Sequence, residues 1–74
     1  MFTSNVKRLM EEKKKTFQDV VSDSGLSRQT IHKARQDEGI AESRLSTIGR
    51  IAHALEVPVK DLFDGEYEEP HHDK

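Results

Sequence analysis

The sequence has no cysteine, no tryptophan and only two prolines among its 74 residues. Without cysteine, neither a disulfide nor a thiolate metal site can form. The chain also lacks an apolar run near the roughly 20 residues of a membrane span, and its first residues lack the apolar segment of a signal peptide. We therefore expect one small, soluble, cytoplasmic domain, stabilised by regular helix packing or by dimerisation.

Charge is unevenly distributed along the chain, although the formal net charge is only -2. Residues 64–74 carry five acids and one lysine, a net charge of -4, whereas residues 1–63 carry eleven basic and nine acidic residues, a net charge of +2. A charged segment with little apolar content is typical of disorder. We predict a mildly basic domain at residues 1–63 and an acidic, disordered tail at residues 64–74.

Apolar residues recur at helical spacing through the body of the chain, and no segment has the alternation of a strand. We predict an all-α domain without a sheet, because only helices fit this period. The expected helices span residues 5–14, 17–24, 27–36, 45–55 and 58–63, and residues 36–43 are expected to form a loop.

Local signals mark the ends of the second and third of these helices. Thr16 with Asp19 forms a variant of the capping box at the start of the second helix. Gly25 can end that helix in the left-handed conformation, and the Ser27 hydroxyl can cap the next helix by accepting from the amide of Gln29 or Thr30. Two short helices joined in this way have the spacing of a helix-turn-helix.

The residues of this segment, together with the run LSTIGRIAHALEVPVKDLF at 45–63, resemble those of the lambda-repressor-like, Cro/cI-type (XRE) helix-turn-helix family. The likeness rests on Val20, Val21, Gly25, Leu26 and the stretch SRQTI, and it covers about residues 4–63. It implies a compact five-helix DNA-binding domain that binds double-stranded DNA as a homodimer. It also implies transcription regulation, commonly repression, in a prokaryotic cell or a phage-infected bacterium, with no cofactor.

The third helix would be the one that reads bases. Ile31 and Ala34 would form its buried side, while its polar side chains would face the major groove. Arginine can bind guanine O6 and N7, glutamine can bind adenine N6 and N7, and lysine can bind guanine or a phosphate. We expect base contacts from Arg28, Gln29 and Lys33, with Thr30 and His32 as weaker candidates.

Backbone contacts are expected where helix starts present free amides to a phosphate, and at both ends of the reading helix. Phe17 stands where the family usually has a glutamine that helps hold the DNA backbone and orient the recognition helix. Arg35 replaces a common acid, and Lys14 replaces a common turn glycine. The expected contacts are Thr16, Phe17, Gln18, Ser27, Gln36, Ser43 and Arg44.

Other readings of the sequence remain open. The polar side of the third helix could simply be solvated, and the fold could serve as a protein-binding adapter or antitoxin-like partner without strong DNA readout. We expect no enzyme, because the sequence has no Gly-rich phosphate loop, no cysteine nucleophile and no recognisable serine-histidine-acid set. We also expect no metal site, since His71 and His72 lie together in the predicted tail.

Overall fold

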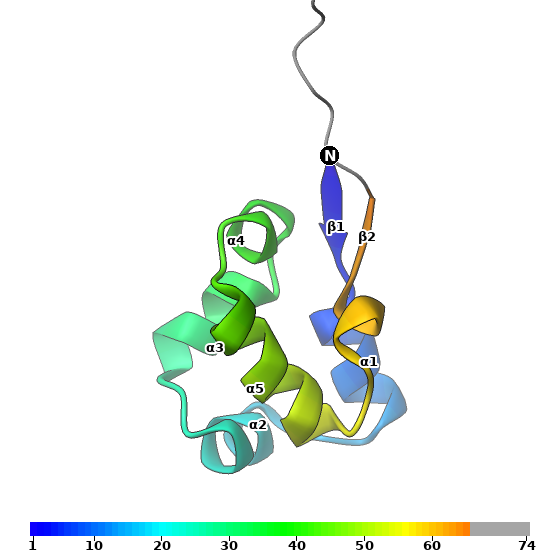
Figure 1. The fold of residues 1–74 in the computed structure, drawn as a ribbon. Coiled ribbons are helices and arrows are strands. Elements are labelled where there is room, and N and C mark those ends of the chain that lie inside the picture. The colour runs from blue at the N-terminus through cyan, green and yellow to red at the C-terminus, as the bar shows by residue number, and fades with distance from the viewer. Residues whose placement is uncertain (66–74) are drawn as a thin grey trace, which may run out of the picture.

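The computed structural model describes residues 1–65 and is mainly helical (Figure 1). The prediction of a compact five-helix domain is confirmed, although not with the same five helices. In chain order the elements are β1 (Phe2–Ser4), α1 (Val6–Glu12), α2 (Phe17–Ser24), α3 (Arg28–Ala34), α4 (Asp37–Ala41), α5 (Leu45–Leu55), the 3₁₀ helix η1 (Val59–Leu62) and β2 (Phe63–Gly65).

Helix α5 lies at the centre of the domain, between α2 and α3 on one side and α1 and η1 on the other (Figure 1). It contributes Ile51 and Leu55 to the core, both fully buried. Burial of one such side chain contributes about 1.5 to 3 kcal/mol, so this core is the main source of stability. The other large, fully buried side chains come from α1, α2, α3 and η1 and are Val6, Val20, Ile31 and Leu62.

The predicted caps of α2 and α3 are confirmed. The Thr16 hydroxyl accepts from the Asp19 amide at 3.0 Å, and the Asp19 carboxylate accepts from the Thr16 amide at 2.9 Å, which completes the capping box. Gly25 ends α2 with φ +73°, and the Ser27 hydroxyl accepts from the Thr30 amide at 3.2 Å. These contacts fix the turn between the two helices.

The prediction of a loop at residues 36–43 is wrong, because Asp37–Ala41 forms α4. Its acidic first turn, Asp37 and Glu38, suits the positive end of the helix dipole. Ile40 is only 2% exposed, and Asp37 accepts from the Ser4 amide at 2.8 Å. A helix of one turn and a half has too few apolar positions to show a period, so tertiary contacts decide its conformation.

The prediction that the fold has no sheet is also wrong. Strands β1 and β2 pair antiparallel, with Phe2 opposite Gly65 and Ser4 opposite Phe63. The Phe2 and Phe63 rings meet edge to face, with centroids 6.1 Å apart. Each strand has only three residues, which is too short for alternation to be recognised in the sequence.

The end of the described chain differs from expectation in two further details. The last helix is the 3₁₀ helix η1, Val59–Leu62, which is shorter than the helix expected over residues 58–63. Asp64 and Gly65, which the sequence places in the acidic tail, lie in β2, and Asp64 accepts from the Asn5 side-chain amide at 2.8 Å. The rest of the predicted tail, residues 66–74, lies outside the described residues. Within residues 1–65, no helix has the length and apolarity needed to cross a membrane.

Candidate nucleic-acid interface

Helix α3 separates a buried side from a polar, exposed side. Ile31 and Ala34 are fully buried, as the helical period predicts. This burial holds the helix at a fixed depth, and the half-buried Leu26 packs against the same core just before the helix begins. The predicted base readers lie on the other side: Arg28, Gln29, His32 and Lys33 are exposed, and Thr30 is half-buried.

The start of α2 meets the start of α3 through side chains. Nη2 of Arg28 donates to Oε1 of Gln18 at 2.6 Å. The Arg28 guanidinium carbon also lies 5.6 Å from the centroid of the Phe17 ring, which is cation–π distance. Two residues predicted to touch the DNA backbone, Phe17 and Gln18, therefore contact a predicted base reader.

Phe17 and Thr16 have limited means of binding a phosphate. The Phe17 side chain has no donor and its ring is occupied, so only the backbone amide of Phe17 can serve. The amide and the hydroxyl of Thr16 already interact with Asp19 in the capping box. Hydrogen bonds from the Thr16 backbone and then from its side chain lower the pKa of Asp19 below 3.8, so this carboxylate is ionised in the first turn of α2.

The other end of α3 carries Lys33, His32 and Gln36. Nε2 of Gln36 lies 3.2 Å from Nε2 of His32, so these two predicted contacts share one patch of surface. Nζ of Lys33 is 4.0 Å from Oε1 of Glu42, with both side chains more than half exposed. Such an exposed pair contributes little, so Lys33 can exchange it for a phosphate or a base.

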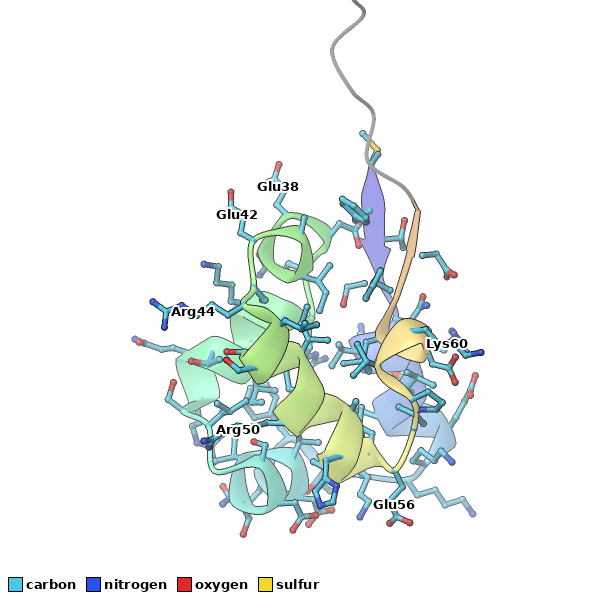
Figure 2. The ribbon with its side chains drawn as sticks, in the orientation of Figure 1. Glu38, Glu42, Arg44, Arg50, Glu56 and Lys60 are labelled. Atoms are coloured by element: carbon cyan, nitrogen blue, oxygen red, sulfur yellow. The ribbon has the colours of Figure 1, made fainter. Side chains whose placement is uncertain are left out.

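The start of α5 lies next to this end of α3. Ser43 and Arg44 line a polar hollow with Thr30 and Lys33, and the hollow is completed by Glu42 and Thr47. The Ser43 hydroxyl donates to the Gly39 carbonyl at 2.7 Å. Arg44 immediately precedes α5, its side chain forms no cap hydrogen bond, and it extends outward beside α3 (Figure 2). The predicted site residues of α3 and of the start of α5 are thus brought together.

Sequence reasoning missed two arginines of this region. The Arg35 guanidinium carbon lies 5.4 Å from the Phe17 ring centroid. Arg50 of α5 reaches the turn between α2 and α3, where its Nη1 lies 3.7 Å from the position that a Cβ on Gly25 would take (Figure 2). The only sign of either residue in the sequence is that Arg35 stands where the family commonly has an acid. Both contacts depend on how the helices cross, which the sequence does not show.

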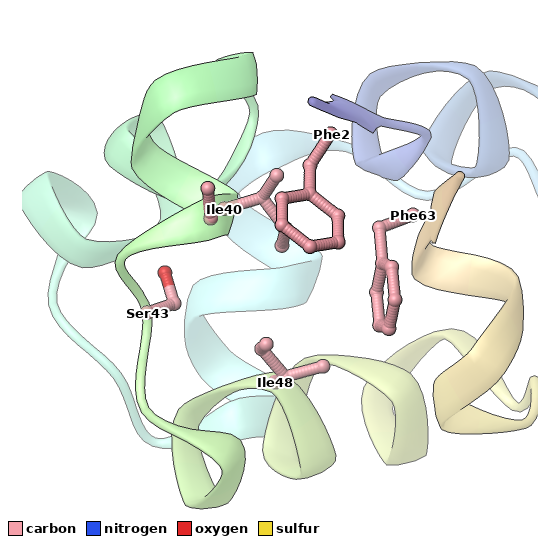
Figure 3. Close-up of a pocket in the computed structure, with 6 residues that line it drawn as sticks. Phe2, Ile40, Ser43, Ile48 and Phe63 are labelled. Carbon is pink, nitrogen blue, oxygen red and sulfur yellow. The ribbon is translucent and has the colours of Figure 1, made fainter. Parts of the chain in front are cut away.

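Within the described residues, metal-ligating side chains do not cluster, and the apolar pocket of Figure 3 is small. No three His, Cys, Asp or Glu side chains of residues 1–65 gather as a metal site requires. The pocket of Figure 3 is apolar and has a volume of about 120 Å³, well below the roughly 300 Å³ at which ligand pockets begin. It is lined by Phe2, Ile40, Ala41, Ser43, Ile48 and Phe63.

Comparison with known proteins connects this geometry to one kind of domain. The sequence model of a family described as a Cro/C1-type HTH DNA-binding domain matches residues 5–67. The match includes all of α1 to α5, η1 and the strand β2. Among curated proteins, no match was found.

Proposed function

This chain belongs to the Cro/C1-type helix-turn-helix DNA-binding family, as its residues predict, and is a DNA-binding transcription regulator; we propose that it binds an inverted-repeat operator as a homodimer and represses transcription. The family is generally not enzymatic. The proposal assigns base reading to α3 and phosphate contacts to the starts of α2 and α5.

One observation carries the proposal, namely the exposed face of α3. Arg28, Gln29 and Lys33 project from a helix whose opposite side, Ile31 and Ala34, is fully buried. Arginine and glutamine have the bidentate geometry that recognises guanine and adenine, and one good pair is worth about 1 to 3 kcal/mol of discrimination. A rigid helix with such side chains in its first two turns suits the major groove.

Phosphate contacts would set the register of α3 on the duplex without reading sequence. The hollow beside Thr30 supports this, because it places Lys33 and Arg44 near the first amides of α5. A phosphate there would interact with two cations and the positive end of a helix dipole. Glu42 opposes this charge, and its weak pair with Lys33 must break when a phosphate binds.

The size of the reading surface supports dimerisation. A single α3 of seven residues can cover only one half-site. Two copies related by a twofold axis place their reading helices one turn of DNA apart, about 34 Å, and this spacing selects an inverted repeat. A dimer bound at a promoter would repress by occupying DNA that polymerase needs.

A protein-binding adapter is the second candidate. It is favoured by the net charge of only +2 on residues 1–63 and by Phe17 in place of the family glutamine. Salt separates the two functions: log affinity for DNA should fall with log salt by about 0.9 per phosphate neutralised. A protein complex held by apolar contacts should change far less.

The decisive experiment is selection of bound duplexes from a random pool, followed by titration with wild type, Arg28→Ala and Arg8→Ala. The control removes the same charge from α1, which lies across α5 from α3 (Figure 1) and in which Arg8 is paired with Glu12. We expect an enriched inverted repeat. Arg28→Ala should relax one position of each half-site by about tenfold to a hundredfold, and Arg8→Ala should not. An unenriched pool would refute sequence-specific binding.

A further inference from the structure

We propose that Phe17 is a positioning residue that sets the base preference of Arg28 without touching a base. Its ring holds the Arg28 guanidinium at the start of α3 before DNA binds. The inference rests on the proposed function, because it assumes that Arg28 reads a base.

The ring is a firm support because two independent features fix it. Phe17 is half-buried and packs against the hydrophobic core. It is also the first residue of α2, directly after Thr16, whose reciprocal hydrogen bonds with Asp19 fix the backbone there. A ring anchored by the core on one side and by a capped helix start on the other has little freedom to move.

Arg28 is held by this ring and by one hydrogen bond. Its guanidinium carbon lies 5.6 Å from the ring centroid, and Nη2 donates to Gln18 at 2.6 Å. Within residues 1–65, no carboxylate lies within salt-bridge distance of it. The guanidinium keeps its charge uncompensated, and its other N–H groups remain free for guanine O6 and N7.

Arg35 shares the ring but occupies the other end of the helix. Its guanidinium carbon lies 5.4 Å from the same centroid, and seven residues, about two helical turns, separate it from Arg28. Phe17 thus interacts with cations at both ends of α3. Arg35 provides a matched control, since it interacts with the same ring but lies at the far end of the helix from the first-turn base reader.

Preorganisation explains why the ring should affect specificity. A long exposed side chain loses rotamer freedom when it binds a base, and holding it beforehand removes part of that cost. Only the correct base makes the bidentate pair, so the gain appears mainly with the correct base. Removing the ring should lower discrimination at the Arg28 position by about threefold to tenfold, the range expected for ordering one long side chain.

The test measures affinity for the selected duplex and for one with the Arg28 base pair exchanged, using wild type, Phe17→Leu, Phe17→Trp, Arg28→Ala and Arg35→Ala. Phe17→Leu should lower the ratio of the two affinities and leave the salt slope unchanged. Phe17→Trp should keep the ratio, because tryptophan is the best ring partner for a cation. Arg35→Ala should weaken both duplexes equally. Thermal melts check that each variant folds.

A double substitution provides the sharpest control. If Phe17 acts through Arg28, adding Phe17→Leu to Arg28→Ala should lower the ratio no further. One set of results would overturn the role of Phe17 alone. In it, wild type prefers one base at this position, Arg28→Ala loses the preference and Phe17→Leu keeps it. A wild type without base preference would overturn the proposed function together with this role.

A measurement without DNA gives a separate check. In Phe17→Leu the chemical shift of the Arg28 Nε–Hε group should change, because the ring current is lost. Its order parameter should fall, because the ring no longer restrains the guanidinium. Unchanged shift and order parameter would show that the ring does not hold Arg28 and would overturn the inference.

Discussion

Replacing Gly39 with alanine should destabilise the domain strongly, whereas the same replacement at Gly49 should stabilise it. Gly39 lies in α4 where that helix crosses the end of α3. A Cβ there would overlap the backbone carbonyl oxygen of Lys33 and lie 2.6 Å from its carbonyl carbon. The neighbour is backbone, so no rotamer change can relieve the overlap.

The cost follows from the two ways in which the chain can respond. If α4 stays, overpacking costs about 1 to 3 kcal/mol. If α4 moves away, Ile40 loses its burial, which is worth about 1.5 to 3 kcal/mol, and Asp37 loses its hydrogen bond to Ser4, worth about 1 kcal/mol. The chain adopts the less costly response, so the loss is about 1 to 3 kcal/mol. At about 4 to 8 °C per kcal/mol for a domain of this size, the Tm should fall by at least about 4 °C.

Gly49 is the matched control because it lies inside α5, and beyond its chain neighbours and the backbone of that helix no atom lies within 4 Å of its would-be Cβ. Alanine is preferred to glycine by about 1 kcal/mol in a helix interior, so the Tm should rise by about 4 to 8 °C. Thermal melts followed by circular dichroism at equal protein concentration measure both variants. A Gly39→Ala protein that melts with the wild type would refute the close approach of α4 to α3.

Three further predictions concern the capping box, a turn and the tail. Hydrogen bonds from Thr16 lower the pKa of Asp19, so the contribution of Asp19 to folding stability is present above its unfolded pKa and is lost as pH falls through the lowered value. The Tm of wild type should therefore fall more than that of Asp19→Asn between about pH 5 and about pH 2. Parallel curves of Tm against pH would contradict this. Lys14 has φ +57°, so Lys14→Gly should gain about 0.5 kcal/mol or more in a urea melt, while Lys13→Gly, where the backbone is right-handed, should lose stability. The acidic residues 66–74 should repel DNA phosphates, so a chain ending after Gly65, which keeps β2 but removes four acids and one lysine, should bind random DNA severalfold more tightly at low salt. Equal affinity would refute this repulsion.

The elements that could be predicted from the sequence are those determined by neighbouring residues. Thr16, Gly25 and Ser27 act within four residues of their own positions, so their capping roles can be read directly. Helix α4 depends instead on Ser4 and on the close crossing at Gly39. The pairing of β1 with β2 joins residues about sixty positions apart, and nothing in either three-residue segment indicates a partner.

The candidate interface also has a part that the sequence predicts and a part that it does not. The exposed side of α3 follows from the burial of Ile31 and Ala34, which the helical period predicts. The contacts of Phe17 with Arg28 and Arg35 depend on the angle between α2 and α3. That angle comes from side chains packed between the helices, so the sequence alone indicates only that position 17 is unusual.

The pairing of β1 with β2 also determines how this domain can be joined to others. Phe2 lies opposite Gly65, and the two-stranded ribbon lies beside α4 at one end of the domain (Figure 1). A polypeptide fused ahead of β1 and one fused behind β2 would therefore leave from the same point. The domain should accordingly tolerate insertion into a surface loop of a carrier protein, or circular permutation with a short linker across the ribbon.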